Sequence, residues 1–273
     1  MLHALIHNKL KDSISSSDIR AFKASEDSLT SSIFGVMQYL PEELLWDLLR
    51  RACNLRTGLP INTGKLTEIK FWPKWTAQDE KITNSNYVEP DLFMRFENFD
   101  LIVEAKKNDD SNQNSQSINQ WKNEIRSYRS EFGEDKKDKL YFIALGGNET
   151  LSNTFVEVDS IQYDIYKASW QSLLNEIVKM RFTFETFPYQ IPRKNQIIRL
   201  LIDLENAFNS HGHLCVEWFE SSEQFNMSID KKSITIFANW ITNQTEFLSE
   251  IEVSKSNKSI NLESINIFSL WKI

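Results

Sequence analysis

Cysteine and histidine are scarce in this chain. Its 273 residues include only two cysteines, Cys53 and Cys215, and four histidines. No CxxC pair occurs, and no cysteine and histidine have the spacing of a zinc ligand set. We therefore expect neither a disulfide framework nor structural zinc. The histidines, at positions 3, 7, 211 and 213, lie near the two ends of the sequence, so a histidine-based mechanism has little support.

Glycine and proline are also few, with seven and six residues, so long flexible linkers are not expected. No run approaches the roughly 20 apolar residues that cross a bilayer. The N-terminal segment lacks a basic region followed by an apolar stretch and a small-residue cleavage site. With 41% hydrophobic and 25% charged residues, the composition is that of a globular protein. We expect a cytoplasmic protein with no membrane contact.

An excess of positive charge is absent too, because the formal net charge is −7. Wide nucleic-acid interfaces draw their affinity from many Lys and Arg contacts to phosphate. The acidic balance does not exclude a nuclease, since carboxylates that bind a metal lower the count and local basic patches can persist. It indicates weak intrinsic affinity for nucleic acid, or a partner that delivers the substrate.

Hydrophobic periodicity predicts alternating helices and strands. The sequence predicts helices near 26–38, 41–53, 113–131, 169–180 and 196–208, and strands near 66–72, 139–145 and 155–158. Two further strands occupy 89–107, residues 182–193 form a connector, and more strands are expected at 213–219, 233–240, 247–253 and 265–273. This order indicates an α/β domain, 1–182, with an αβββαβ core in which helices flank a central mixed sheet. Residues 183–273 are expected to form an α+β C-terminal module of unknown role.

The segment 89–107, EPDLFMRFENFDLIVEAKK, predicts a hairpin with charged residues on one face. If the turn is the two residues Glu97-Asn98, the register sets Asp91 opposite Glu104. Directly opposed side chains share a face, with Cβ atoms roughly 4.5–5.5 Å apart. Lys106 joins them because side chains alternate along a strand. The other face, expected to be the core side, takes Leu92, Leu101 and Val103.

Two facing carboxylates repel each other and are costly to bury, and a divalent cation removes that penalty. Oxygen ligands without His or Cys suit Mg²⁺. The alternative is a solvated strand face that carries Asp91, Glu104 and Lys106. The apolar sequence around Glu104 predicts a central strand, where a solvated face is less available, and favours the metal site.

Pro90-Asp91, twelve intervening residues and then Glu104-Ala105-Lys106 resemble the PD-(D/E)xK nuclease superfamily, whose core has the αβββαβ order. Three flanking pieces extend the resemblance over residues 24–180. Glu26 matches an acidic residue that many members place on the first helix, Gln120 resembles a glutamine of the helix after the ExK strand, and KLYFIALGG resembles the fourth core strand.

The resemblance implies a restriction-endonuclease-like fold and a Mg²⁺-dependent endonuclease acting on DNA, with Mn²⁺ as a substitute. Asp91 and Glu104 would hold one or two cations, helped by Glu26 and the backbone carbonyl of Ala105. Lys106 would act on the attacking water or on the developing charge, and Gln120 would support the site. The resemblance also implies a bacterial anti-phage or restriction-type defence role, a homodimer and an ATP-dependent partner protein.

Several alternatives stay open at the level of sequence. Glu26 also fits as an acid favoured by the helix dipole after a Ser25 cap, with Asp27 competing for the role, and Gln120 fits as an exposed polar residue. Lys122, Arg126 and Arg129 form a basic stripe that either contacts phosphate or pairs with Glu124 and Glu131. Gly146-Gly147 either cradles a phosphate or ends a strand.

Two other functions also remain open. One is a catalytically idle nucleic-acid-binding or scaffolding subunit with the same fold, in a defence or repair complex. The other is an RNA nuclease, although nothing in the sequence indicates a contact to a 2′-hydroxyl.

Overall fold

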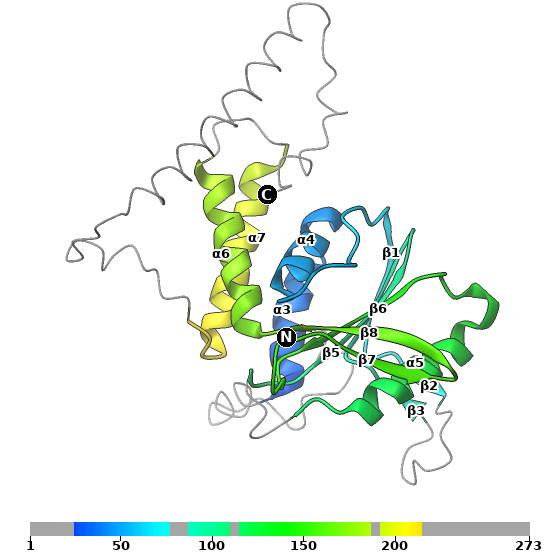
Figure 1. Ribbon diagram of the computed structural model, residues 1–273. Helices are drawn as coiled ribbons and strands as arrows, with labels where there is room; N and C mark the ends of the chain where they lie inside the picture. Colours follow the sequence, from blue (N-terminus) through cyan, green and yellow to red (C-terminus); the bar gives the residue numbers. More distant parts are fainter. Residues whose placement is uncertain (1–24, 77–86, 110–114, 187–191, 215–273) are drawn as a thin grey trace, which may run out of the picture. The chain divides into compact units, whose positions relative to one another are not determined.

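A mixed β-sheet with helices on both faces forms the centre of the protein (Figure 1). The computed structural model describes residues 25–76, 87–109, 115–186 and 192–214. Within these residues the sheet has six strands in the order β1-β4-β5-β6-β8-β7. The strands are β1 (Leu66–Phe71), β4 (Leu92–Phe96), β5 (Asp100–Ala105), β6 (Leu140–Leu145), β7 (Thr154–Val158) and β8 (Ile161–Ala168). The predicted α/β class with a central mixed sheet is confirmed.

The sheet is mixed because it contains both parallel and antiparallel strand pairs. β5 is parallel to β6 and β6 is parallel to β8, whereas β1–β4, β4–β5 and β7–β8 are antiparallel. A separate small sheet pairs β2 (Trp75–Thr76) with β3 (Tyr87–Val88). The helices are α3 (Glu26–Met37), α4 (Glu42–Ala52), α5 (Ile118–Phe132), α6 (Trp170–Thr186) and α7 (Lys194–Ser210), with a 3₁₀ turn η1 (Gly133–Asp135).

Helix α5 covers one face of the sheet. Trp121, Ile125 and Tyr128, spaced along one side of this helix, pack against Phe93 and Ile102 of β4 and β5. Ile118, the first residue of the helix, does not join this side and is 54% exposed. The face that carries Glu104 therefore has an apolar core as well. The other face is a core face as expected, because Leu92, Leu101 and Val103 are fully buried.

Helix α4 lies over the opposite face, together with α3 (Figure 1). Trp46 of α4 is fully buried and its ring contacts Phe96, Phe99 and Tyr141, with ring centroids 6.0, 4.8 and 6.3 Å away. Helix α6 packs against α4 and α7, and α7 packs against α3. The buried apolar side chains on both faces make β5 a central strand, buried along its whole length.

The β4–β5 hairpin has the predicted register. Arg95 pairs with Asp100 and Leu92 with Val103, and the Phe96 amide donates to the Phe99 carbonyl at 2.8 Å. Glu97-Asn98 is therefore the two-residue turn, and continuing the register sets Asp91 across from Glu104. This prediction is confirmed, and it fixes which side chains share the face under α5.

Strand β8 was not predicted. Asp159 and Ser160, both with positive φ (50° and 64°), form the turn that leads from β7 into it. Left-handed backbone at a two-residue hairpin turn favours Gly or Asn, so Asp-Ser gave no hairpin signal. Helix α6 also extends to Thr186, past the start of the connector expected at 182.

The contacts along the chain separate two units, Met1–Val216 and Glu217–Ile273. Of the strand expected at 213–219, only His213 and Leu214 are described, and neither lies in a strand. The strands expected at 233–240, 247–253 and 265–273 lie outside the described residues. The division into 1–182 and 183–273 stays a prediction.

An ion pair anchors the turn end of the hairpin. Asp100 is fully buried and accepts two hydrogen bonds from Arg95, at 2.9 and 2.8 Å, and one from the Tyr128 hydroxyl at 2.7 Å. Arg95 lies over the Phe132 ring, 4.3 Å from its centroid. A buried carboxylate with three donors is well compensated, and it ties the hairpin to α5.

We predict that Arg95→Leu lowers the free energy of unfolding by about 3–5 kcal/mol, because it leaves the charge of Asp100 buried without its ion-pair partner. Chemical denaturation at neutral pH measures this change. The control Arg56→Leu, at an exposed position, should change stability by less than about 0.5 kcal/mol. Equal stability of the two variants would show that the buried ion pair does not anchor the hairpin.

Candidate active site

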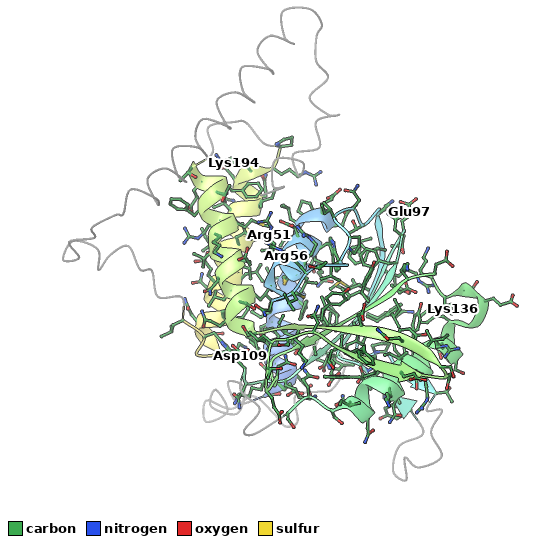
Figure 2. The ribbon with its side chains drawn as sticks, in the orientation of Figure 1. Arg51, Arg56, Glu97, Asp109, Lys136 and Lys194 are labelled. Carbon is green, nitrogen blue, oxygen red and sulfur yellow. The ribbon has the colours of Figure 1, made fainter. Side chains whose placement is uncertain are left out.

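Asp91, Glu104 and Lys106 meet at one end of the sheet, as the hairpin register requires. Asp91 immediately precedes β4, Glu104 is the penultimate residue of β5, and Lys106 follows β5. Asp91 and Glu104 are only 6% and 2% exposed. Figure 2 labels Glu97 at the turn end of the hairpin and Asp109 beyond the other end of β5, and the three site residues belong to the Asp109 end.

Two donors hold the carboxylate of Asp91. The indole N–H of Trp72 donates to Oδ1 at 3.0 Å, and the backbone N–H of Ala105 donates to Oδ2 at 2.8 Å. Burial raises the pKa of Asp91 well above its ordinary value, and the nearby charge of Glu104 raises it further, against the lowering effect of the Ala105 hydrogen bond. Asp91 is fixed in position but is costly to ionise.

Glu104 has two unlike oxygen atoms. Oε1 accepts from the Lys106 ammonium at 2.5 Å and from the Gln120 amide at 2.6 Å. Oε2 is buried and receives no hydrogen bond from any residue that the structure describes. Burial raises the pKa of Glu104 well above its usual range, and the charge of Glu124 adds to the increase. The Gln120 contact makes this residue part of the site rather than an exposed polar side chain.

Lys106 lies between two carboxylates. Its Nζ is 2.5 Å from Glu104 Oε1 and 3.5 Å from Glu26 Oε1. Burial alone would lower the pKa of this ammonium, but the charge and the hydrogen bond of Glu104, with the charges of Glu26 and Asp91, outweigh burial and raise it. Lys106 is therefore protonated at neutral pH and acts in this arrangement as a positive charge and hydrogen-bond donor.

Glu26 belongs to the same group of residues. Besides its ion pair with Lys106, its Oε2 accepts from the backbone N–H of Lys107 at 2.9 Å. Glu26 is the first residue of α3, whose N-cap is Ser25. The two alternatives for this residue are therefore compatible: it lies at the N-terminus of the helix and also contacts Lys106. Its own interactions tie α3 to the end of β5.

Backbone packing holds the end of β5 in place. Gly146, with φ of 70°, has no room for a side chain, because a Cβ there would collide with the Lys106 carbonyl. The N–H groups of Gly146 and Gly147 donate to the carbonyls of Ala168 and Asn108, at 2.9 and 2.6 Å. Both amides are used inside the fold, which favours the strand-end interpretation of this glycine pair over a phosphate cradle.

Gln116 links the same elements. Its Nε2 donates to the carbonyl oxygens of Glu104 at 3.0 Å and Gly146 at 3.1 Å, and its Oε1 accepts from the Trp121 indole at 2.8 Å. It joins the ends of β5 and β6 to the start of α5. No local signal predicts this role, because nothing in the sequence distinguishes Gln116 from its polar neighbours.

Glu124 lies beside Glu104 on the buried side of α5. One of the two alternatives for the basic stripe placed it on a solvated face as an ion-pair partner, but it is 1% exposed and contacts Glu104. A signal for its position exists in the sequence: at helical spacing, residue 124 falls between Gln120 and Tyr128 on the side turned to the sheet. A carboxylate on a buried side of a helix is rare enough to mark a site.

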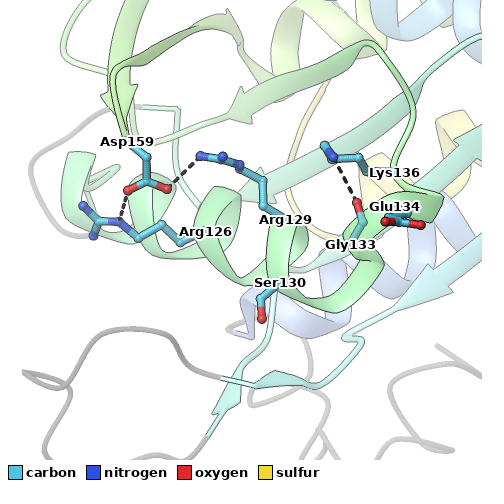
Figure 3. A pocket seen from close by; sticks show the side chains of 7 residues that line it. All are labelled: Arg126, Arg129, Ser130, Gly133, Glu134, Lys136 and Asp159. Atoms are coloured by element: carbon cyan, nitrogen blue, oxygen red, sulfur yellow. Dashed lines mark hydrogen bonds and ion pairs between the residues drawn. The ribbon is translucent and has the colours of Figure 1, made fainter.

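Two arginines of the basic stripe of α5, Arg126 and Arg129, have their partner outside the candidate site. Arg129 and Arg126 pair with Asp159 of the β7–β8 turn, with N–O distances of 2.7 and 3.8 Å, in a pocket that also includes Lys136 (Figure 3). Of the two alternatives for this stripe, pairing with Glu124 is excluded because Glu124 is buried, and Asp159 supplies the counter-charge for Arg126 and Arg129. Lys136 precedes β6, and is therefore at the end of the sheet away from Glu104.

Among the described residues, no group of three or more His, Cys, Asp or Glu side chains stands ready to hold a metal ion. In this arrangement the acidic side chains are turned to donors: Asp91 to Trp72 and Ala105, and Glu104 to Lys106 and Gln120. The buried, unpartnered Oε2 of Glu104 and both oxygens of Glu124 are the donor atoms that fit a hard cation such as Mg²⁺.

No protein-family model matches the chain. The chain is similar to the uncharacterized protein PM0110 of Pasteurella multocida (strain Pm70). The two are 26% identical over an alignment of 281 positions, which covers 94% of this chain and 97% of that protein. Within the described part of the chain, no helix is both long enough and apolar enough to cross a membrane.

We predict that the metal-free protein loses stability as the pH rises from about 4.5 to about 8. Burial, and next the charge of Asp91, raise the pKa of Glu124 to about 8 from its ordinary value of 4.5. Between these values the folded state binds more protons than the unfolded state, so the free energy of unfolding falls with increasing pH. The shifts of Asp91 and Glu104 have the same sign. Denaturant unfolding in EDTA, measured from pH 5 to pH 8, tests this.

Glu124→Gln should flatten that dependence and stabilise the metal-free protein at pH 8. Glu131→Gln, an exposed substitution on the same helix, should follow the wild-type profile. Parallel profiles for the wild type and Glu124→Gln would contradict the prediction.

Proposed function

We propose that this protein is a Mg²⁺-dependent endonuclease that hydrolyses DNA phosphodiester bonds and has a restriction-endonuclease-like core. The observation that carries the proposal is the convergence of Asp91, Glu104 and Lys106 at one end of the sheet. The element order α4, β1, β4, β5, α5, β6 supports it, because it reproduces the αβββαβ order with β2 and β3 inside one connection.

The acidic residues fit a cation of the Mg²⁺ type. Asp91 and Glu104 would hold it, and Glu26 and the Ala105 carbonyl lie at the same end of β5. A bound divalent cation would lower the pKa of a coordinated water and offset negative charge that builds up on the phosphate. The buried Oε2 of Glu104, without a donor among the described residues, gains a partner in that state.

Lys106, Gln120 and Glu26 would stabilise developing charge and hold the site residues in position. The protonated Lys106 would donate to the phosphate oxygens as negative charge develops there, which is a typical electrostatic contribution to catalysis. Gln120 is a positioning residue, because its amide fixes Glu104 Oε1. Glu26 is also a positioning residue, since it holds both the Lys106 ammonium and the Lys107 backbone.

The wider role is proposed from the superfamily resemblance. It comprises DNA as the substrate, a two-fold homodimer that would cut both strands, an ATP-dependent partner and a place in bacterial anti-phage or restriction-type defence. Mn²⁺ is proposed as a substitute for Mg²⁺, and the cytoplasm as the site of action. The net charge of −7 favours delivery of the substrate by a partner over strong intrinsic binding.

We predict Mg²⁺- or Mn²⁺-dependent cleavage of DNA that Lys106→Ala reduces by about 10²–10³-fold, because the variant lacks the donor for the developing charge. Supercoiled, linear and single-stranded DNA are incubated with each cation, and products are followed on gels over time. Glu104→Gln should reduce cleavage at least as strongly. Lys65→Ala, an exposed lysine near the turn end of the hairpin, should retain wild-type rates.

The same assay separates the competing functions. Cleavage of RNA alone would replace the proposed substrate class. Binding of DNA without cleavage under any condition would favour the idle nucleic-acid-binding subunit. Cleavage that survives Lys106→Ala unchanged would remove the proposed site as its source.

A further inference from the structure

Helix α5 presents two polar side chains to Glu104 from one face. Gln120 and Glu124 are four residues apart and therefore lie one helical turn from each other on the same side. Gln120 donates to Glu104 Oε1 at 2.6 Å, and Glu124 is close enough to Glu104 for each to influence the pKa of the other. The helix thus supplies an amide and a carboxylate to the same strand residue.

The carboxylate of Glu124 is only weakly compensated. The neighbouring side chains of Glu104 and Gln120 lower its pKa, but burial outweighs them and raises it. Both of its oxygens are buried and have no donor in good hydrogen-bonding geometry among the residues that the structure describes, and Glu104 Oε2 has the same status. Two ionised carboxylates are both acceptors, so their approach cannot be a hydrogen bond unless one of them carries a proton. A buried polar atom without a partner costs roughly 1–3 kcal/mol, more when it is charged, and here three such atoms lie on neighbouring residues.

The local charge is also unbalanced. Asp91, Glu104 and Glu124 are three buried carboxyl groups, and Lys106 is the cation that acts on all three. Buried ion-pair networks that serve only stability are paired and fully hydrogen-bonded, as at Asp100. A site with surplus carboxylates and unpartnered oxygens is instead suited to a cation that arrives from solution.

We infer that Glu124 is a further cation ligand, which binds a divalent ion of the Mg²⁺ class together with the Oε2 atom of Glu104. The inference rests on the proposed function, since it adds a carboxylate from α5 to the site at the end of the hairpin. The two oxygens of Glu104 would then have different partners. Oε1 accepts from Lys106 and Gln120, and Oε2 would bind the ion together with Glu124. Mg²⁺ and Mn²⁺ both accept such oxygen ligands.

The test is Mn²⁺ binding by the full-length, metal-free protein at pH 8, measured by calorimetry and by the loss of the free-ion paramagnetic resonance signal. Glu124→Gln keeps the shape of the side chain and adds an amide donor for Glu104 Oε2, but it lacks the ligand charge. We expect it to weaken Mn²⁺ binding by at least about tenfold while the metal-free variant stays folded by circular dichroism. Glu131→Gln should bind as the wild type does.

Wild-type Mn²⁺ affinity in a folded Glu124→Gln protein would overturn the inference and leave Glu124 as a protonated structural partner of Glu104. Absence of Mn²⁺ binding in the wild type would overturn it as well. If Glu124→Gln does not fold, Glu124→Asp, which keeps the charge but is shorter by one methylene, should weaken binding, and unchanged affinity there would again overturn the inference.

Mn²⁺ binding tests the ligand assignment and nucleic-acid cleavage tests the proposed function, so the two proposals can be contradicted separately. Mn²⁺ binding that depends on Glu124, in a protein that cleaves no nucleic acid, would support the ligand assignment and count against the proposed function. Cleavage that depends on Lys106, with Mn²⁺ binding indifferent to Glu124, would support the function and overturn the ligand assignment.

Discussion

The two-residue turn at Glu97-Asn98 is the constraint on which the rest of the site depends. A turn of this length fixes the β4–β5 register, and a shift by one residue would move every side chain to the other face. With the observed register, Asp91 faces Glu104, and the Ala105 amide lies within 2.8 Å of Asp91 Oδ2. The neighbouring elements then fit around this pair: α5 brings Gln120, and α3 brings Glu26 to Lys106.

The two ends of β5 show two ways in which the fold holds a buried carboxylate. Asp100 and Glu104 lie on the same face of one strand, and both are buried under α5. Asp100 accepts three hydrogen bonds from Arg95 and Tyr128, so its charge is compensated within the fold. Glu104 has one oxygen with donors and one without any among the described residues. Incomplete compensation at a buried carboxylate is what a ligand-binding site requires and what a purely structural site avoids.

Local patterns predicted the hairpin and the Asp91–Glu104 pair, because alternation along a strand and a short turn are properties of neighbouring residues. Strand β8 escaped prediction because its turn, Asp159-Ser160, adopts positive φ without glycine or asparagine. In the sequence, Glu124 is an ion-pair partner of the basic stripe in one of two alternatives, and its buried position was not predicted. Only the packing of α5 on Phe93 and Ile102 decides which face is buried, and this contact joins residues far apart in the sequence.

The protonation of Lys106 limits what the site can do. An ammonium between Glu104 and Glu26, with its pKa raised by both, is a poor proton acceptor at neutral pH. In the proposed nuclease, a carboxylate would therefore accept the proton of an attacking water, a bound cation would lower the pKa of that water, and Lys106 would contribute charge. Its hydrogen bond, with that of Gln120, occupies Oε1 of Glu104 and leaves Oε2 without a donor among the described residues. The lysine that marks the motif in the sequence thus also determines which carboxylate oxygen remains for a ligand.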